Sequence, residues 1–183
     1  MTIVGAMQFT LVPHPATPPS DPAMKVWANV DHSALGAMAT TNIWFGVSAP
    51  LDRFVIPALS EPWRAEDLWQ TTCFEAFLRA SGQDSYREWN FAPAGNWAAF
   101  DFTERREGKA WAEVGSPPYI RMEDNFTWWT VGATIAVEAD RRWELGLSAV
   151  LEEQDGTKSY WALAHAGQAP DFHDPGCFVA RLP

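Results

Sequence analysis

Residues 86–102 read YREWNFAPAGNWAAFDF. Two runs of six residues, 86–91 and 97–102, are rich in aromatic side chains and flank Pro93-Ala94-Gly95-Asn96, a turn signal of the hairpin type. The stretch therefore predicts two neighbouring antiparallel strands joined by a short turn.

The same pattern extends outward over most of the chain. Short extended runs recur at the 8–12-residue spacing typical of a sandwich or barrel, and helical periodicity is nearly absent. We predict a single-domain, all-β antiparallel sandwich of the jelly-roll or immunoglobulin-like type, spanning residues 1–183. About ten strands are expected, at residues 7–12, 25–32, 42–48, 68–79, 86–91, 97–102, 126–137, 143–152, 158–165 and 177–182, with a short helix near residues 63–68.

Composition limits the possible partners. A chain of 183 residues with 47% apolar content suits one domain with a sizeable core, and its 11 Trp and 11 Phe raise the question of an aromatic-lined pocket. The net charge of −10 argues against nucleic acid and anionic membranes as partners. Since no signal peptide or long apolar run is visible, we expect a cytoplasmic protein. Cys73 and Cys177 lie far apart in the sequence, and we expect reduced thiols.

Strand alternation predicts which side chains share a face. In residues 68–79, one face carries Phe74 and the other carries Glu75, and both faces are partly apolar, which predicts a central strand covered on both sides. Glu88 and Asn90 share a face in the next strand. In residues 97–102 we expect Trp97 on the ligand side, opposite core-like phenylalanines. Aromatic and polar groups would then line a concave binding face.

Several segments resemble a known group of proteins. These are residues 68–78, 86–93 and 97–100, with 160–165, 170–173 and 177–178 near the end. They are similar to the DOMON-like bacterial proteins, which are related to carbohydrate-binding module family 9. The resemblance implies a β-sandwich that binds a sugar or haem at one face or edge. In family 9 modules, tryptophans clamp a sugar and calcium ions brace loops, but these residues do not map one by one onto this chain.

Six residues are candidates for ligand binding. Carboxylates and amides can hold sugar hydroxyls, and a tryptophan ring suits the apolar face of a sugar. The alternatives are core packing for each tryptophan and pairing with Arg87 or Arg105 for the carboxylates. The candidates are Trp69, Glu75, Glu88, Asn90, Trp97 and Trp161.

A second group could hold a metal ion or haem. His165, Asp171 and His173 form the main His/Asp cluster, although their spacing matches no standard metal motif. His165, His173 or Met122 could serve as an axial haem ligand. The alternative is that these histidines anchor a loop through hydrogen bonds to the backbone.

The sequence thus predicts a binding module rather than an enzyme, because it contains no dinucleotide, phosphate-loop or zinc-protease motif. The expected ligand is a carbohydrate or a similar small molecule, on a face lined by aromatic and carboxylate side chains. A haem or redox module, or a domain that binds a partner protein, remains the alternative. The residues alone assign no cofactor; haem and calcium are implied by the resemblance only.

Overall fold

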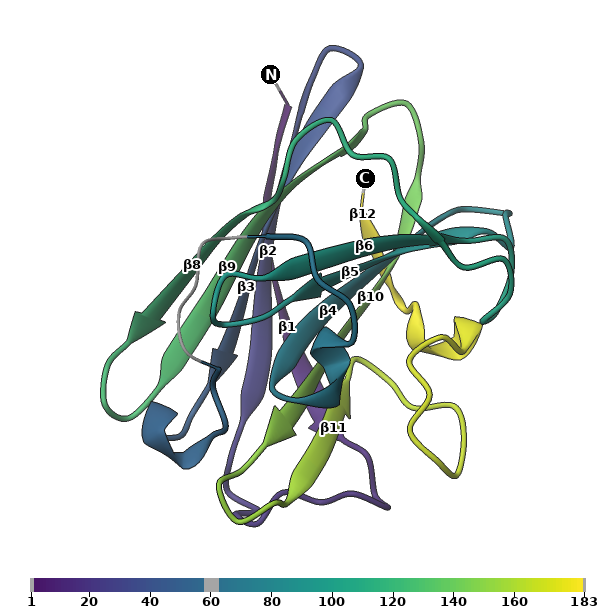
Figure 1. The fold of residues 1–183 in the computed structure, drawn as a ribbon. Coiled ribbons are helices and arrows are strands. Elements are labelled where there is room, and N and C mark those ends of the chain that lie inside the picture. Colours follow the sequence, from purple (N-terminus) through teal and green to yellow (C-terminus); the bar gives the residue numbers. More distant parts are fainter. Residues whose placement is uncertain (1, 58–62, 183) are drawn as a thin grey trace.

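A computed structural model describes residues 2–57 and 63–182 of the chain (Figure 1). Its helices are three short 3-10 turns, η1 (Leu51–Arg53), η2 (Leu68–Gln70) and η3 (Pro175–Cys177). Within the described residues, no helix is long and apolar enough to cross a membrane. The strands are β1 (Thr2–Pro13), β2 (Val26–Leu35), β3 (Met38–Val47), β4 (Cys73–Ala80), β5 (Tyr86–Phe91), β6 (Trp97–Phe102), β7 (Ala110–Trp111), β8 (Tyr119–Asp124), β9 (Trp129–Glu138), β10 (Trp143–Glu152), β11 (Lys158–Ala162) and β12 (Ala180–Leu182).

The strands form one strongly curled antiparallel sheet, a half-barrel rather than two separate layers. Its order is β7-β6-β5-β4-β10-β11-β1-β2-β3-β9-β8, with β12 paired to β10. Strand β1 joins the two halves, because it pairs with β2 along its length and with β11 at its end, where Val12 faces Ala162. The all-β antiparallel prediction is confirmed, whereas the jelly-roll or immunoglobulin-like arrangement is corrected by this shared strand.

The number of strands in the described part of the chain is twelve rather than about ten. The two that sequence analysis missed, β7 and β8, lie at the edges of the sheet. Strand β7 has only two residues, and the sequence of β8, YIRMED, carries three charged side chains. Strand β7 is too short to show apolar alternation, and β8 shows it only through Ile120 and Met122, which alternate with charged residues.

The two halves of the sheet enclose a shared core. We call β1, β2, β3, β8 and β9 the first half, and the remaining strands the second half. Phe45 of the first half stacks on Phe74 of the second, with ring centroids 4.9 Å apart, and Trp129 packs edge-on to Phe74 at 5.5 Å. Trp129 is fully buried.

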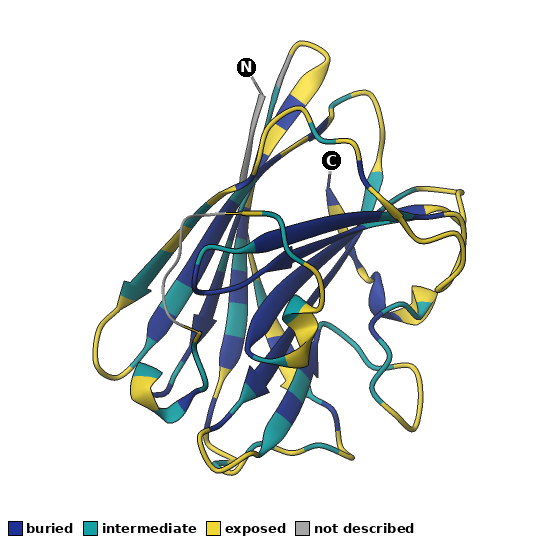
Figure 2. Cartoon of the chain, in the orientation of Figure 1, coloured by how far each residue is buried: buried dark blue, intermediate teal, exposed yellow. Residues whose placement is uncertain are grey.

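The second half is buried on both faces, and Figure 2 shows its central strands dark along most of their length. One face contributes to the shared core. The other, which we call the outer face, is partly covered by residues 164–179, the C-terminal segment. Phe178 of this segment stacks on Phe77 of β4 at 5.6 Å and approaches β10 at Gly146, where a Cβ atom would lie 2.6 Å from the Phe178 ring. The prediction of a central strand covered on both sides is confirmed for β4.

Several predicted strand boundaries differ from those of the structure, for example 7–12 for β1 and 158–165 for β11, and one difference matters for function. Strand β4 begins at Cys73 and not at residue 68, because residues 68–70 form the helical turn η2 after Asp67, whose backbone is left-handed (φ 57°). Trp69 therefore leaves the plane of the sheet. At the end of the chain, residues 175–177 form η3, so the last strand covers only Ala180–Leu182.

Candidate functional site

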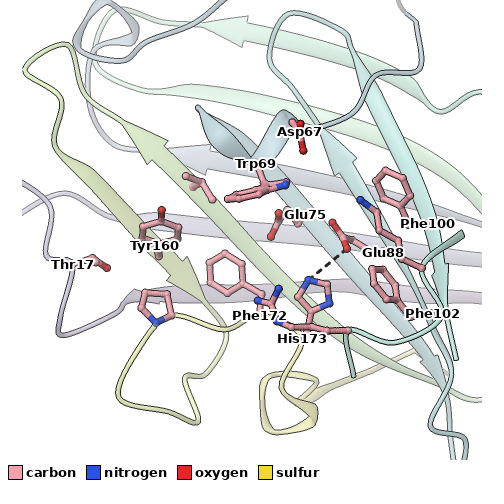
Figure 3. A pocket seen from close by; sticks show the side chains of 14 residues that line it. Thr17, Asp67, Trp69, Glu75, Glu88, Phe100, Phe102, Tyr160, Phe172 and His173 are labelled. Atoms are coloured by element: carbon pink, nitrogen blue, oxygen red, sulfur yellow. Dashed lines mark ion pairs between the residues drawn. The ribbon is translucent and has the colours of Figure 1, made fainter. Parts of the chain in front are cut away.

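The outer face of the second half contains a cavity of about 530 Å³ between η2 and the C-terminal segment (Figure 3). This volume falls in the range of small-molecule sites. Strands β4, β5, β6, β10 and β11 form its floor. Its lining residues are Thr17, Asp67, Trp69, Glu75, Glu88, Phe100, Phe102, Arg106, Lys109, Val150, Tyr160, Pro170, Phe172 and His173.

Two buried carboxyl groups lie at the centre of the floor. Glu75 is 3% exposed and Glu88 is 5% exposed, and both line the cavity. One oxygen of each carboxyl has a neutral donor: Ser148 Oγ donates to Glu75 Oε2 at 2.7 Å, and Asn90 Nδ2 donates to Glu88 Oε1 at 2.5 Å. The other oxygen of each group makes no hydrogen bond to the described residues, which leaves it available to a ligand.

Burial changes the protonation of both groups. Loss of hydration, followed by the nearby Glu88 charge, raises the pKa of Glu75 to about 8, although the Ser148 hydrogen bond and Arg106 oppose the shift. Burial also raises the pKa of Glu88, against the opposing Asn90 hydrogen bond. Glu75 is therefore mostly protonated at pH 7 and can donate a hydrogen bond as well as accept one.

A third polar group, His173, faces the cavity beside Glu88. Tyr86 Oη accepts the backbone N–H of Arg106 at 3.1 Å and lies 2.7 Å from His173 Nδ1, and we assign the Tyr86 proton to that nitrogen. His173 then carries its proton on Nε2, 3.7 Å from Glu88 Oε2 (dashed in Figure 3). Burial, with help from Arg106, lowers the pKa of His173 to about 4, so the ring is neutral at pH 7 and this contact joins no opposite charges.

Aromatic rings form the walls of the cavity. Trp69, 47% exposed, lies next to Glu75 in Figure 3, while Phe100 and Phe102 lie beside Glu88. Tyr160 and Phe172 line the opposite side, with ring centroids 6.1 Å apart. The carboxyl groups thus lie at the bottom of a pocket whose sides are mainly ring faces.

The two phenylalanines of β6 were expected in the core, and Trp97 was expected in the site. Phe100 and Phe102 are buried, as expected, but in a separate cluster on the outer face, and Trp97 lies in the shared core instead of the site. The turn at residues 92–96 determines these faces. That turn places Phe91 opposite Trp97, and Glu88 therefore pairs with Phe100. Residues directly opposite on antiparallel strands share a face, so Phe100 lines the cavity and Trp97 points to the shared core. Counting the register outward from this turn would have assigned these faces from sequence.

The structure separates the three candidate tryptophans. Only Trp69 lines the cavity. Trp97 is 5% exposed and packs against Trp89 at 6.1 Å, under the Arg64 guanidinium. Trp161 is buried in the shared core, where its Nε1 donates to Ser159 Oγ at 2.9 Å. The predicted grouping of Trp97 and Trp161 with the carboxyl groups is therefore corrected, since both rings lie on the opposite face of the sheet.

Asn90 lies on the outer face, as predicted, but beneath Glu88. It is 1% exposed and does not line the cavity. Its amide donates to Glu88, and its Oδ1 lies 3.7 Å from the buried, free thiol of Cys73. Asn90 therefore orients a carboxyl group. The expected concave face is also corrected. The carboxyl groups lie on the face of the sheet that is turned away from the shared core, where η2 and the C-terminal segment form the walls of the cavity.

The expected metal or haem group is dispersed. His165 Nε2 lies 2.9 Å from the carbonyl oxygen of Val12, and Asp171 forms ion pairs with Arg105 and Arg106. Met122 packs against the shared core from β8. Of the predicted group only His173 lines the cavity, and among the described residues no three His, Cys, Asp or Glu side chains gather as a metal site would require.

A second, more open hollow of about 1270 Å³ lies between the end of β9 and strands β4 to β6. Four of the six charged side chains that line it form ion pairs with each other. Arg87 forms a two-pronged ion pair with Asp101 at 2.6 and 2.8 Å, and Arg141 contacts Glu138 at 2.9 Å. Because buried groups with open hydrogen-bonding positions line the first cavity, that cavity is the better candidate site.

Comparison with known proteins gives matches among solved structures only. No family model and no curated protein matches the chain. A proposed carbohydrate-binding protein from Bacteroides uniformis shares 16% identity at a TM-score of 0.60, over 94% of this chain and 84% of that one. This likeness shows the fold. Family 9 carbohydrate-binding modules from Caldicellulosiruptor kristjanssonii, solved with glucose and with cellotriose, match at a TM-score of 0.45 with 9% and 10% identity, over 84% of this chain and 74% and 72% of theirs.

Proposed function

We propose that the chain is a non-catalytic module that binds a sugar-like small molecule in the cavity on the outer face. The observation that carries the proposal is the placement of two buried carboxyl groups, Glu75 and Glu88, in the same cavity as the half-exposed ring of Trp69. A sugar ring presents an apolar face that stacks on an aromatic side chain, and hydroxyl groups at its edge that need directional hydrogen bonds.

The protonation states suit a ligand rich in hydroxyl groups. A hydroxyl both donates and accepts hydrogen bonds. A protonated Glu75 can donate to it, the free oxygen of Glu88 can accept from it, and His173 Nε2–H offers a second donor. The B. uniformis protein of similar fold is itself proposed to bind carbohydrate.

The first test is a titration of tryptophan fluorescence with a panel of monosaccharides and disaccharides. We expect saturable binding with a dissociation constant from about mM to about μM. Trp69→Ala should weaken binding at least about tenfold, as loss of a stacking contact predicts. Trp63→Ala is the matched control, because Trp63 is 56% exposed and does not line the cavity.

Three results would contradict the proposal. If no sugar of the panel binds, or if both tryptophan variants bind like the natural chain, the cavity is not a sugar site. Turnover of an aryl glycoside that Glu88→Gln abolishes would show instead that the carboxyl groups act in hydrolysis, which requires one protonated and one ionised partner.

A further inference from the structure

The floor of the cavity is acidic, and neither of its carboxyl groups forms an ion pair with a lysine or arginine of the described residues. In the described ranges, no lysine or arginine nitrogen lies within 4 Å of either Glu75 or Glu88, and the nearest basic group, His173, contacts Glu88 at 3.7 Å. Most other carboxylates with little exposure are paired: Glu153 with Arg53 at 2.7 Å, for example, and Glu144 with Arg79 at 2.5 Å. Two adjacent carboxyl groups without such a partner are costly to bury in ionised form.

The two cations that line the cavity are directed elsewhere. Both side chains are exposed. The guanidinium of Arg106 is held by Asp171, with nitrogen-to-oxygen distances of 2.8 and 3.2 Å. The ammonium group of Lys109 lies 3.9 Å from the centre of the Phe100 ring. Both cations act on the carboxyl groups through space, but neither of them forms an ion pair with Glu75 or Glu88.

The walls of the same cavity suit a positive charge. Five aromatic side chains line it, and a cation near a ring face is attracted by the electron density of that face. A cage of rings with a carboxylate at its base is a chemically favourable environment for an ammonium group. The rings are those of Trp69, Phe100, Phe102, Tyr160 and Phe172.

We propose that the cavity prefers a cationic member of the sugar-like class, an amino sugar or amino polyol, whose ammonium group lies between Glu75 and Glu88. The inference rests on the proposed function and narrows it. The ammonium donates to the free oxygens of both carboxyl groups, and the carbon skeleton lies against Trp69. A neutral sugar fills the same volume but leaves the acidic floor without a counter-charge.

Cation binding must displace a proton from this site at neutral pH. Glu75 holds a proton there, and an ammonium ligand favours the ionised carboxylate, so binding releases the proton to solvent. Affinity for an amine that stays protonated should therefore rise with pH, up to about tenfold per pH unit below pH 8. The other ionisable groups that face this position are Glu88 of β5, Arg106 and Lys109 between β6 and β7, Tyr160 of β11, His173 of the C-terminal segment and Asp67 before η2.

The test is calorimetric titration with matched ligand pairs, sorbitol against N-methylglucamine and glucose against glucosamine. At pH 7 we expect the cationic member of each pair to bind at least about tenfold more tightly. The binding enthalpy should change with the ionisation enthalpy of the buffer, as expected when a proton is released. Glu88→Gln should remove most of the preference, and Glu75→Gln should remove the proton release.

Glu123→Gln is the control, since it removes one negative charge from β8 in the first half without touching the cavity. It should keep both the preference and the proton release. Equal affinity for charged and neutral members would overturn the cationic preference and leave the proposed function intact. Failure of all four ligands to bind, with the fold verified by circular dichroism, would overturn the proposed function and this inference with it.

Discussion

Two tryptophans on opposite faces of the second half separate ligand binding from stability. Trp69 lies on η2 above the cavity, whereas Trp97 is buried in the shared core. Trp69→Ala should remove ligand binding and change the free energy of unfolding by less than about 1 kcal/mol, because half of the ring is already in water. Trp97→Ala should cost about 3–5 kcal/mol. Denaturant unfolding of both variants measures this, and equal destabilisation would contradict the assigned positions.

Glu75 should make stability fall as pH rises. Its pKa is about 8 in the native state and near 4.5 in the unfolded chain, so between these values the native state binds more protons. Between pH 6.5 and 8, the slope from this group should reach on the order of 1 kcal/mol per pH unit. His173 opposes this slope near pH 6.5, because its native pKa of about 4 lies below the unfolded value of 6.5 and the unfolded chain therefore binds more protons there; this opposing contribution fades as the pH rises toward 8.

Glu75→Gln keeps an acceptor for Ser148 and removes the titrating proton. Its stability should therefore change less between pH 6.5 and 8 than that of the natural chain, and Glu123→Gln should leave the slope unchanged. Urea unfolding at both pH values measures the difference. A steeper fall in the Glu75 variant would contradict the assigned protonation.

At the scale of elements, the C-terminal segment forms one wall of the site and is held in place at Gly146. A methyl group there would lie 2.6 Å from the Phe178 ring, which stacks on Phe77 and under the Arg79 guanidinium. Gly146→Ala should therefore displace Phe178, cost about 1–3 kcal/mol and loosen Phe172 and His173. Hydrogen exchange in residues 172–178 should become faster, and ligand affinity should fall.

Gly115→Ala is the control, since a Cβ at Gly115 would have no heavy atom of the described residues within 4 Å apart from its chain neighbours. It should leave both exchange and affinity unchanged. If Gly146→Ala exchanges and binds like the natural chain, the segment is not positioned through Phe178.

The positions of the strands could be predicted from the sequence more reliably than the faces on which their side chains lie. Alternation around Glu75, Glu88 and Asn90 placed all three on one face, which the structure bears out. Alternation alone misplaced Trp97. The face on which Trp97 lies depends on its pairing with Phe91, and the number of residues in the turn at 92–96 sets that pairing. Trp69 was expected in a strand. The backbone at Asp67, just before η2, is left-handed, and because no glycine occupies that position the sequence does not signal the turn.

At the scale of the whole molecule, the curled sheet joins parts of the site that are far apart in the sequence. Phe172 and His173 meet Glu75 and Glu88 only because β12 pairs with β10 and brings the C-terminal segment back across the outer face. A single sequence can show that these residues are polar or aromatic. It cannot show long-range pairing of this kind, which depends on the order of strands in the sheet.

The shared core predicts cooperative unfolding. Residues of both halves pack against each other, as Phe45 does on Phe74, and β1 belongs to both. We expect one calorimetric transition whose van 't Hoff and calorimetric enthalpies agree. Two resolved transitions would show that the halves fold separately and would contradict the single domain predicted from sequence.

A crystal structure of the chain with the tightest-binding member of the ligand panel, at a concentration that saturates binding in solution, tests the central claim most directly. We predict ligand density in the outer-face cavity, with its apolar side against Trp69 and a polar group within hydrogen-bond distance of both Glu75 and Glu88. Density elsewhere, such as in the hollow between β9 and strands β4 to β6, with the outer-face cavity empty, would contradict the account.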